Sequence, residues 1–178
     1  MIDARDTLSA ARRLERVMLA ATFLLVALAL IGLAAGIANP LDMARGIAWQ
    51  GGYDGVALTH GQAWLLIAHV AIHVGVWIAL LIVARGLFGQ LAAGNPAAAA
   101  RSARRVARLL WAMLAWGLVS QPIASATATW GLPEGERTLS VAFGTPQISV
   151  AFAALMASFM AHAFALGAEL WQDHREVI

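Results

Sequence analysis

Four long stretches without any charged residue dominate the pattern of hydrophobic and polar positions along this chain. They lie between Arg16 and Asp42, Asp54 and Arg85, Arg108 and Glu134, and Arg137 and Glu169. A hydrocarbon core about 30 Å thick needs roughly 20 apolar residues of helix, so each stretch can hold one crossing. We therefore predict an all-α fold, an integral membrane four-helix bundle in one domain over residues 1–178, with spans near 17–38, 62–84, 109–130 and 148–168.

The first and third spans are the ones with rival interpretations. An arginine-bearing region precedes the first span, as in a signal peptide, but its apolar run is longer than the roughly 7–15 residues of such peptides, which favours a retained helix. The third span carries Pro122 among several hydroxyl side chains. Its apolar part is expected to stop near Val119 and to leave a bent or shortened end.

The arginines fall on alternate sides of the predicted spans and so predict an orientation. Only Arg45 and Arg137 would lie on one side. Because basic residues collect in cytoplasmic loops, the split predicts a multi-pass protein of the bacterial inner membrane with both termini in the cytoplasm, N-in and C-in. The cytoplasmic set is Arg5, Arg12, Arg13, Arg16, Arg85, Arg101, Arg104, Arg105, Arg108 and Arg175.

Composition narrows the classes of function. The mean hydropathy is +0.73, with 61% hydrophobic and 12% charged residues, far too apolar for a soluble domain of this size. Cysteine is absent, which removes disulfides and thiolate metal sites. No nucleotide-binding glycine pattern, zinc-protease signature or nucleophile elbow occurs, which argues against an enzyme. Arginine position is explained by membrane orientation, so no direct contact with nucleic acid is expected.

The segments outside the spans carry their own signals. Residues 1–16 suit either an interfacial helix or a solvated tail, and residues 39–61 a re-entrant or surface-lying loop. Residues 138–143 alternate as in one short strand. Asn95 and Pro96 are predicted to cap and start a helix in the cytoplasm. In that helix a basic stripe suited to anionic lipid headgroups, or to a specific partner, is formed by Arg101, Arg104, Arg105 and Arg108.

Small residues at spacings of four predict where helices approach each other. The first span has Gly32 and Gly36, which suit either internal packing or dimerisation, and the third span has no such seam. The other two spans supply Ala71, Gly75 and Ala79, and Ala153, Ala157, Ala161 and Ala165.

Three histidines lie within the predicted spans. His69 and His73 are four residues apart on one helix face, and counting from the charged span ends puts His73 and His162 at similar depth. Imidazole ligates haem iron, so a cross-helix pair of His69 or His73 with His162 is a candidate b-type haem site. Hydrogen bonding of these imidazoles between helices or to a backbone carbonyl is the simpler interpretation, and it needs no cofactor and no metal.

Two segments carry a family resemblance. After the second span the chain reads LFGQLAAGNP, and it ends in FALGAELWQDHREVI. These segments resemble the domain-of-unknown-function 2975 family of four-span bacterial membrane proteins. The matching residues are Leu87, Phe88, Leu91, Gly94, Pro96, Phe164, Gly167, Ala168, Leu170, Asp173 and Ile178, and the departures are Ala97, Ala165, Leu166 and Val177. The resemblance implies no catalytic residues. Members of that family commonly occur alongside small helix-turn-helix regulators, so the resemblance points to a regulatory role.

Together these patterns predict a non-enzymatic membrane protein. It would be an accessory subunit or regulatory component that binds a larger membrane complex or its own copies through its helices and arginine-rich face. The alternative is the haem-binding electron-transfer protein. A permease would need a polar route, for which Ser158, His162 and Glu169 are too few.

Overall fold

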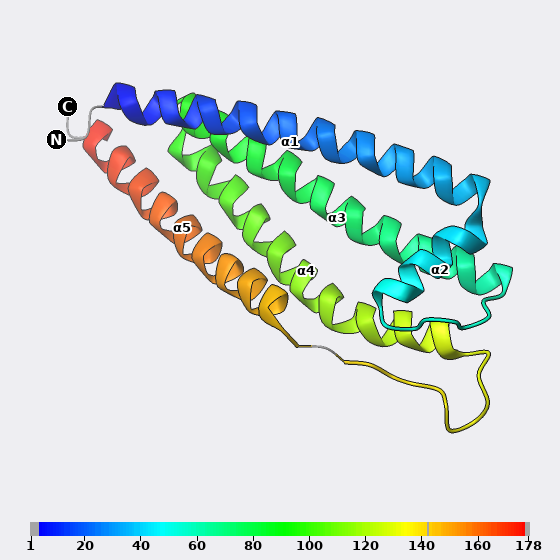
Figure 1. Cartoon of the computed structure of the whole chain (residues 1–178). Helices are drawn as coiled ribbons and strands as arrows, with labels where there is room; N and C mark the ends of the chain where they lie inside the picture. Colours follow the sequence, from blue (N-terminus) through cyan, green and yellow to red (C-terminus); the bar gives the residue numbers. More distant parts are fainter. Residues whose placement is uncertain (1–3, 142, 177–178) are drawn as a thin grey trace.

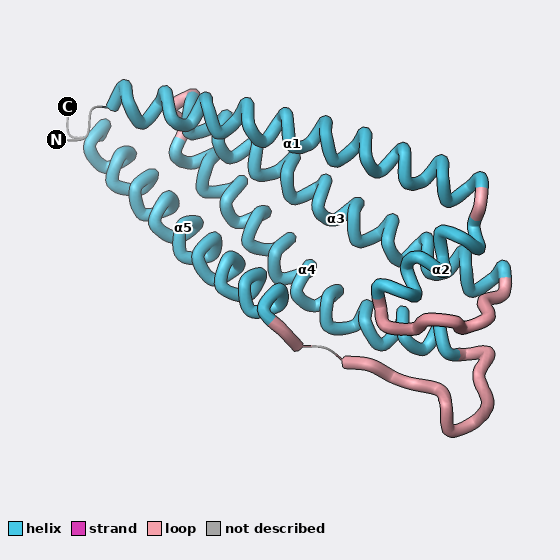
Figure 2. The backbone as a smooth tube through the Cα atoms, in the orientation of Figure 1, coloured by secondary structure: helices cyan, strands magenta, loops and turns pink. Residues whose placement is uncertain are grey.

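The computed structural model describes residues 4–141 and 143–176, with side chains from Leu8 to Leu170 apart from residue 142. Within this part of the chain it contains five helices and no strand (Figures 1 and 2). The helices are α1 (Ala4–Ala38), α2 (Pro40–Gln50), α3 (His60–Ala92), α4 (Pro96–Thr129) and α5 (Thr145–Glu176). Four of them, α1, α3, α4 and α5, are long and apolar enough to cross a membrane.

The four long helices lie side by side in chain order, each antiparallel to the next (Figure 1). Extensive contacts join α1 to α3, α3 to α4 and α4 to α5. α1 begins and α5 ends at the same end of the molecule, where α4 also begins. The first part of α1 includes residues 4–16, which were expected either as an interfacial helix or as a tail.

The core lies along α4, which has a long neighbour on each side. In one cluster Leu80 of α3 and Met113 of α4 pack with Ala154 of α5. In a second cluster Leu87 of α3 and Ala103 of α4 pack with Ala161 of α5. The buried alanines of α4 lie mostly before the predicted third span, at Ala99, Ala100, Ala103 and Ala107, while Ala128 lies within it.

A tight turn joins α3 to α4 and fixes where α4 begins. The Gly94 N–H donates to the Leu91 carbonyl and the Asn95 N–H to the Gln90 carbonyl. Gly94 has φ +67°, the left-handed conformation that this helix-ending motif needs. The Asn95 side chain then accepts the Ala98 N–H at 3.0 Å, and Pro96 takes the first helical position, as predicted.

The segment that was expected to be a loop contains the helix α2. Pro40 occupies its first turn, and its small face packs on the start of α3. Ala44 is fully buried there and lies against Ala63 and Leu66. The chain then turns through Gly52 and Gly55, which both have positive φ.

α4 continues as a helix through Pro122 to Thr129, so its C-terminal end is not shortened. Proline has no N–H, so the helix loses one backbone hydrogen bond there. Beyond the proline, two buried hydroxyls bond to carbonyls of the same helix: the Ser125 Oγ donates to the Pro122 carbonyl and the Thr129 Oγ1 to the Ser125 carbonyl.

The same two hydroxyls hold the following loop against α4. Ser125 Oγ accepts the Ser140 N–H at 2.9 Å, and Thr129 Oγ1 accepts the Thr138 N–H at 3.1 Å. The described residues around Leu139 run alongside α4 without forming a strand. The described residues of the predicted strand therefore lie in a loop, which is held by hydrogen bonds to side chains of α4.

α5 begins beside the middle of α4 rather than beside its end (Figure 1). Pro146 and Val150, in its first turns, line a cavity together with Met113 and Gly117 of α4. α5 is therefore displaced along the helix axes toward the end where α4 starts.

Candidate functional site

The first three turns of α4 separate arginines from alanines. The alanines from Ala99 onward are buried against the neighbouring helices, while all four arginines of the stripe are exposed. This separation follows from the helical period, which places residues three and four apart on one face. Within the described residues, none of the four guanidinium groups forms an ion pair or a side-chain hydrogen bond. The stripe is Arg101, Arg104, Arg105 and Arg108.

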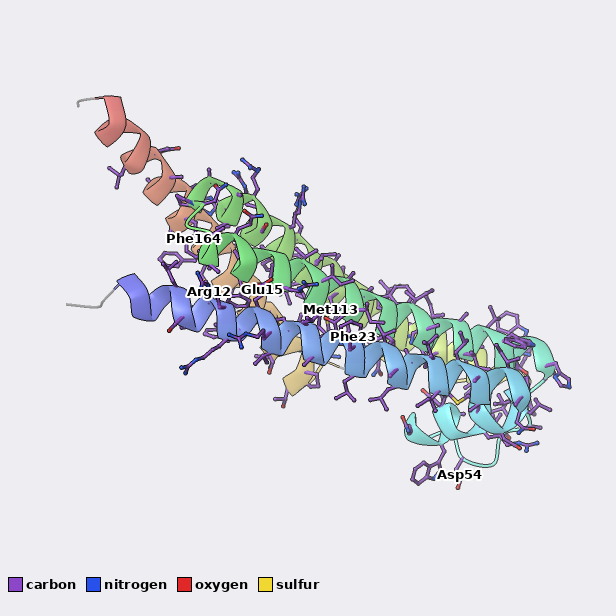
Figure 3. The ribbon with its side chains drawn as sticks, turned by 90° about the horizontal axis from the view of Figure 1, so that it is seen from above. Arg12, Glu15, Phe23, Asp54, Met113 and Phe164 are labelled. Carbon is purple, nitrogen blue, oxygen red and sulfur yellow. The ribbon has the colours of Figure 1, made fainter. Side chains whose placement is uncertain are left out.

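Further arginines collect at the same end of the molecule, on α1 and α3. Arg85 of α3 lies 3.9 Å from Glu15 of α1, measured from Nε to Oε1, and both side chains are partly exposed. The Glu15 carboxylate also lies beside Gly89 of α3, where an added Cβ would be in ordinary van der Waals contact with Oε1 at 3.5 Å. Figure 3 shows Arg12 and Glu15 near the start of α1, far from Asp54 at the opposite end.

The two arginines at the opposite end have local partners. Arg45 forms an ion pair with Asp42 one turn earlier on α2, with an N–O distance of 2.8 Å. The Arg137 guanidinium lies 5.5 Å from the Trp130 ring, and its Nε donates to the Leu132 carbonyl. The two ends therefore differ in how many unpartnered cations they present as well as in how many arginines they hold.

His69 and His73 lie in the middle of α3 beside aromatic side chains. The His69 ring is 5.5 Å from that of Trp116 on α4, and His69 Nδ1 and Trp116 Nε1 are both buried without a hydrogen-bond partner among the described residues. His73 Nε2 accepts the Trp77 indole N–H at 3.3 Å. His73 and Trp77 also line a cavity of about 140 Å³ bounded by α4 and the start of α5.

His162 lies elsewhere, at the arginine-bearing end. Its Nδ1 is 2.9 Å from the Ser158 carbonyl of its own helix, and Ser158 Oγ accepts the Trp111 indole N–H. The preceding residue, Ala161, packs with Leu87 of α3. His162 is thus close to the level at which α4 begins.

The structure does not bring His162 together with His69 or His73. His73 is level with Val150 on α5, twelve residues before His162, which is about 18 Å of helix. Two axial ligands must both lie within about 2 Å of one iron, so this separation does not fit a shared haem. Within the residues that the structure describes, no three histidine or acidic side chains form a group suited to a metal ion.

One surface feature did not emerge from the sequence reasoning. An apolar groove of about 390 Å³ separates parts of α1 and α3. Its signal in the sequence is the pair Gly32 and Gly75, which the spacing of small residues predicts as positions of helix packing or, at Gly32, of dimerisation. In the structure a Cβ at either position would meet no atom within 4 Å.

No protein-family model matches this chain, and neither a curated protein nor a solved structure matches it. The likeness to the domain-of-unknown-function 2975 family accordingly stays a prediction from two sequence segments. The structure itself supports a coarser statement, that four long apolar helices give this chain the character of a multi-pass membrane protein.

Proposed function

We propose that this chain is a non-enzymatic component of a bacterial inner membrane, an accessory subunit or regulator that binds its partner through its helices and its arginine-rich end. In this proposal the arginine-rich end and both termini lie in the cytoplasm. The observation that carries it is the contrast between the two ends. The stripe on α4 is exposed and unpartnered, whereas Arg45 and Arg137 are held by local partners.

Electrostatics explains why such a stripe favours the cytoplasmic surface. The cytoplasmic leaflet is rich in anionic lipids, and each basic residue close to it contributes about 1 kcal/mol of attraction. Local pairing reduces that contribution at Arg45, because its carboxylate partner Asp42 is 2.8 Å away. The end with unpartnered arginines therefore gains most from facing the anionic leaflet.

The packing of α4 supports a binding role for this end. Ala99 and Ala103 are almost completely buried, so the backbone that carries the stripe is held firmly between α3 and α5. A fixed backbone presents its arginines in a constant pattern, which reduces the entropy lost when they bind. The same pattern of arginines would suit anionic lipid headgroups and an acidic surface of a partner protein.

The orientation is tested with single cysteines, because the natural chain has none. We choose Ala97→Cys, exposed beside the start of α4, and Glu134→Cys, exposed in the loop at the other end. A membrane-impermeant maleimide should label Glu134→Cys in intact cells and Ala97→Cys only after permeabilisation. The reverse pattern would contradict the proposed orientation.

The binding role is tested by copurification from native membranes in mild detergent. The wild-type chain should elute in a defined larger complex. Replacing the four stripe arginines by glutamine should release it, because the exposed cations are lost while the buried alanines remain. The control is Arg45→Gln with Arg137→Gln, which should leave the complex intact. Elution of the wild type as a lone species would contradict an accessory role.

A further inference from the structure

The groove between α1 and α3 has a wholly apolar lining. It extends from Leu25 and Ile78 at one end to Met43 of α2 at the other, and encloses about 390 Å³. Its walls are open to the surroundings, since Leu28 and Leu30 expose 56% and 61% of their surface. No residue in the most apolar stretch of α1 is buried, so no other described segment covers the open side of the groove.

Three glycines show where the groove is open and where it closes. A Cβ built on Gly32 or Gly75 would meet nothing within 4 Å, so no side chain fills the space beside them. One turn beyond Gly32, a Cβ on Gly36 would lie 3.6 Å from both Ile67 and Met43. Ile67 and Met43 therefore close the groove beneath α2, so an occupant longer than the groove extends beyond the opposite end.

That opposite end leads toward Arg85. Ile78, the last α3 residue of the lining, is seven residues before Arg85, about 10 Å along the helix. Ile78 and Arg85 share a helix face at this spacing. The 3.9 Å ion pair with Glu15 leaves the Arg85 side chain 45% exposed and able to accept another anion. Arg12 and Arg16 are also exposed at the start of α1.

We propose that this groove binds one acyl chain of an anionic phospholipid from the leaflet on the arginine side, with the headgroup phosphate at Arg85. The inference rests on the membrane placement proposed above. An empty groove would leave its lining without dispersion contacts, and a flexible hydrocarbon chain restores them at no cost in polar desolvation. The negatively charged phosphate then lies beside the guanidinium of Arg85, beyond the apolar lining of the groove.

The dimensions favour a lipid chain over a second copy of this protein. A helix is about 10 Å across, so over the nine residues from Leu25 to Leu33 it would occupy roughly 1,000 Å³. The groove holds less than half of that. A helix from another copy would cover the opening without filling the space beside Gly32 and Gly75.

The test is native mass spectrometry of the full chain, purified in mild detergent and supplied with phosphatidylglycerol or phosphatidylcholine. Gly32→Leu and Gly75→Leu fill the groove, and both positions have room for a side chain. Gly167→Leu on α5 is the matched control, because its added Cβ also meets nothing. The wild type and the control should retain one more phosphatidylglycerol than either groove variant.

A second variant keeps the inference testable if the leucines disturb folding. Arg85→Gln should weaken retention of phosphatidylglycerol about fivefold and that of phosphatidylcholine less, because the choline cation of that lipid offsets the charge of its phosphate. Equal lipid retention in wild type and both kinds of variant would overturn the inference. A dimer that the groove variants convert to a monomer would overturn it in favour of a second copy. Reversed maleimide labelling would instead refute the proposed orientation, so the two failures are distinguishable.

Discussion

Gln62 at the start of α3 donates its side-chain amide to the backbone carbonyl of Thr127 near the end of α4, with an N–O distance of 2.8 Å. Thr127 lies in the last turn of its helix, where carbonyls have no partner within the helix. The Gln62 Oε1 meanwhile accepts the N–H and hydroxyl of Thr59, which completes a capping box at the start of α3. One buried side chain thus satisfies the ends of two helices.

Replacing Gln62 is expected to destabilise this end of the molecule. Gln62→Ala removes the side-chain half of the capping box and the bond to Thr127, which together should cost about 1–3 kcal/mol. Thr59→Ala removes the hydroxyl half of the capping box, leaves the bond to Thr127 in place and is the control. The measurement is the thermal unfolding midpoint in detergent. A Gln62→Ala midpoint equal to that of Thr59→Ala would show that the interhelical bond contributes nothing.

The loop after α4 should detach when its two hydroxyl anchors are removed. In a Ser125→Ala, Thr129→Val variant the amides of Thr138 and Ser140 lose their acceptors and should exchange with deuterium markedly faster. Hydrogen–deuterium exchange of the peptide over this loop measures the effect. Ser120→Ala is the control, since its hydroxyl bonds only within α4, to the Gly117 carbonyl. Unchanged exchange in the double variant would contradict the anchoring.

The turn between α3 and α4 should be sensitive to Gly94. A side chain in the left-handed conformation at φ +67° is strained, so Gly94→Ala should lower the free energy of unfolding by about 1–2 kcal/mol. Gly86→Ala is the control, because Gly86 lies inside α3 and its added Cβ meets nothing. It should be neutral or stabilising, since alanine is the better helix former. Denaturant titration in mixed micelles compares the two, and equal destabilisation would argue against strain at Gly94.

The haem alternative is tested at His162. If His162 were an axial ligand, wild-type protein from cells grown with haem precursor would be coloured, and His162→Ala would change its visible spectrum. The separation from His73 leads us to expect identical spectra for the two proteins. His73→Ala is measured in parallel. A visible band that shifts in both variants would contradict the arrangement of α3 and α5 described above.

The spans were predictable because charge and hydropathy act locally along the chain. A run without charges longer than the hydrocarbon thickness identifies a crossing wherever its neighbours lie. The turn before α4 was predictable for a similar reason, since Asn95 and Pro96 suit their positions through their own covalent structure. The presence of α2 was not, because its stability comes from burying Ala44 against Ala63 and Leu66 of α3, a contact that no local pattern encodes.

The depth of the histidines illustrates the same limit. Counting residues from the charged span ends placed His73 and His162 at one level, which assumes that both helices share an axial position. The structure displaces α5, because Ala154 packs beside Leu80 and Ala161 beside Leu87. The axial position of α5 relative to α3 depends on how the side chains of the two helices interlock. It cannot be predicted from the composition and length of each span.

The arrangement of the long helices in chain order bears on how the protein enters its membrane. Each helix finds its main contacts with the long helix immediately before or after it in synthesis. Such near-neighbour contacts require little loop closure, and they form early. Each new helix can therefore dock on its predecessor as it leaves the ribosome, and the finished assembly needs no later exchange of partners in the bilayer.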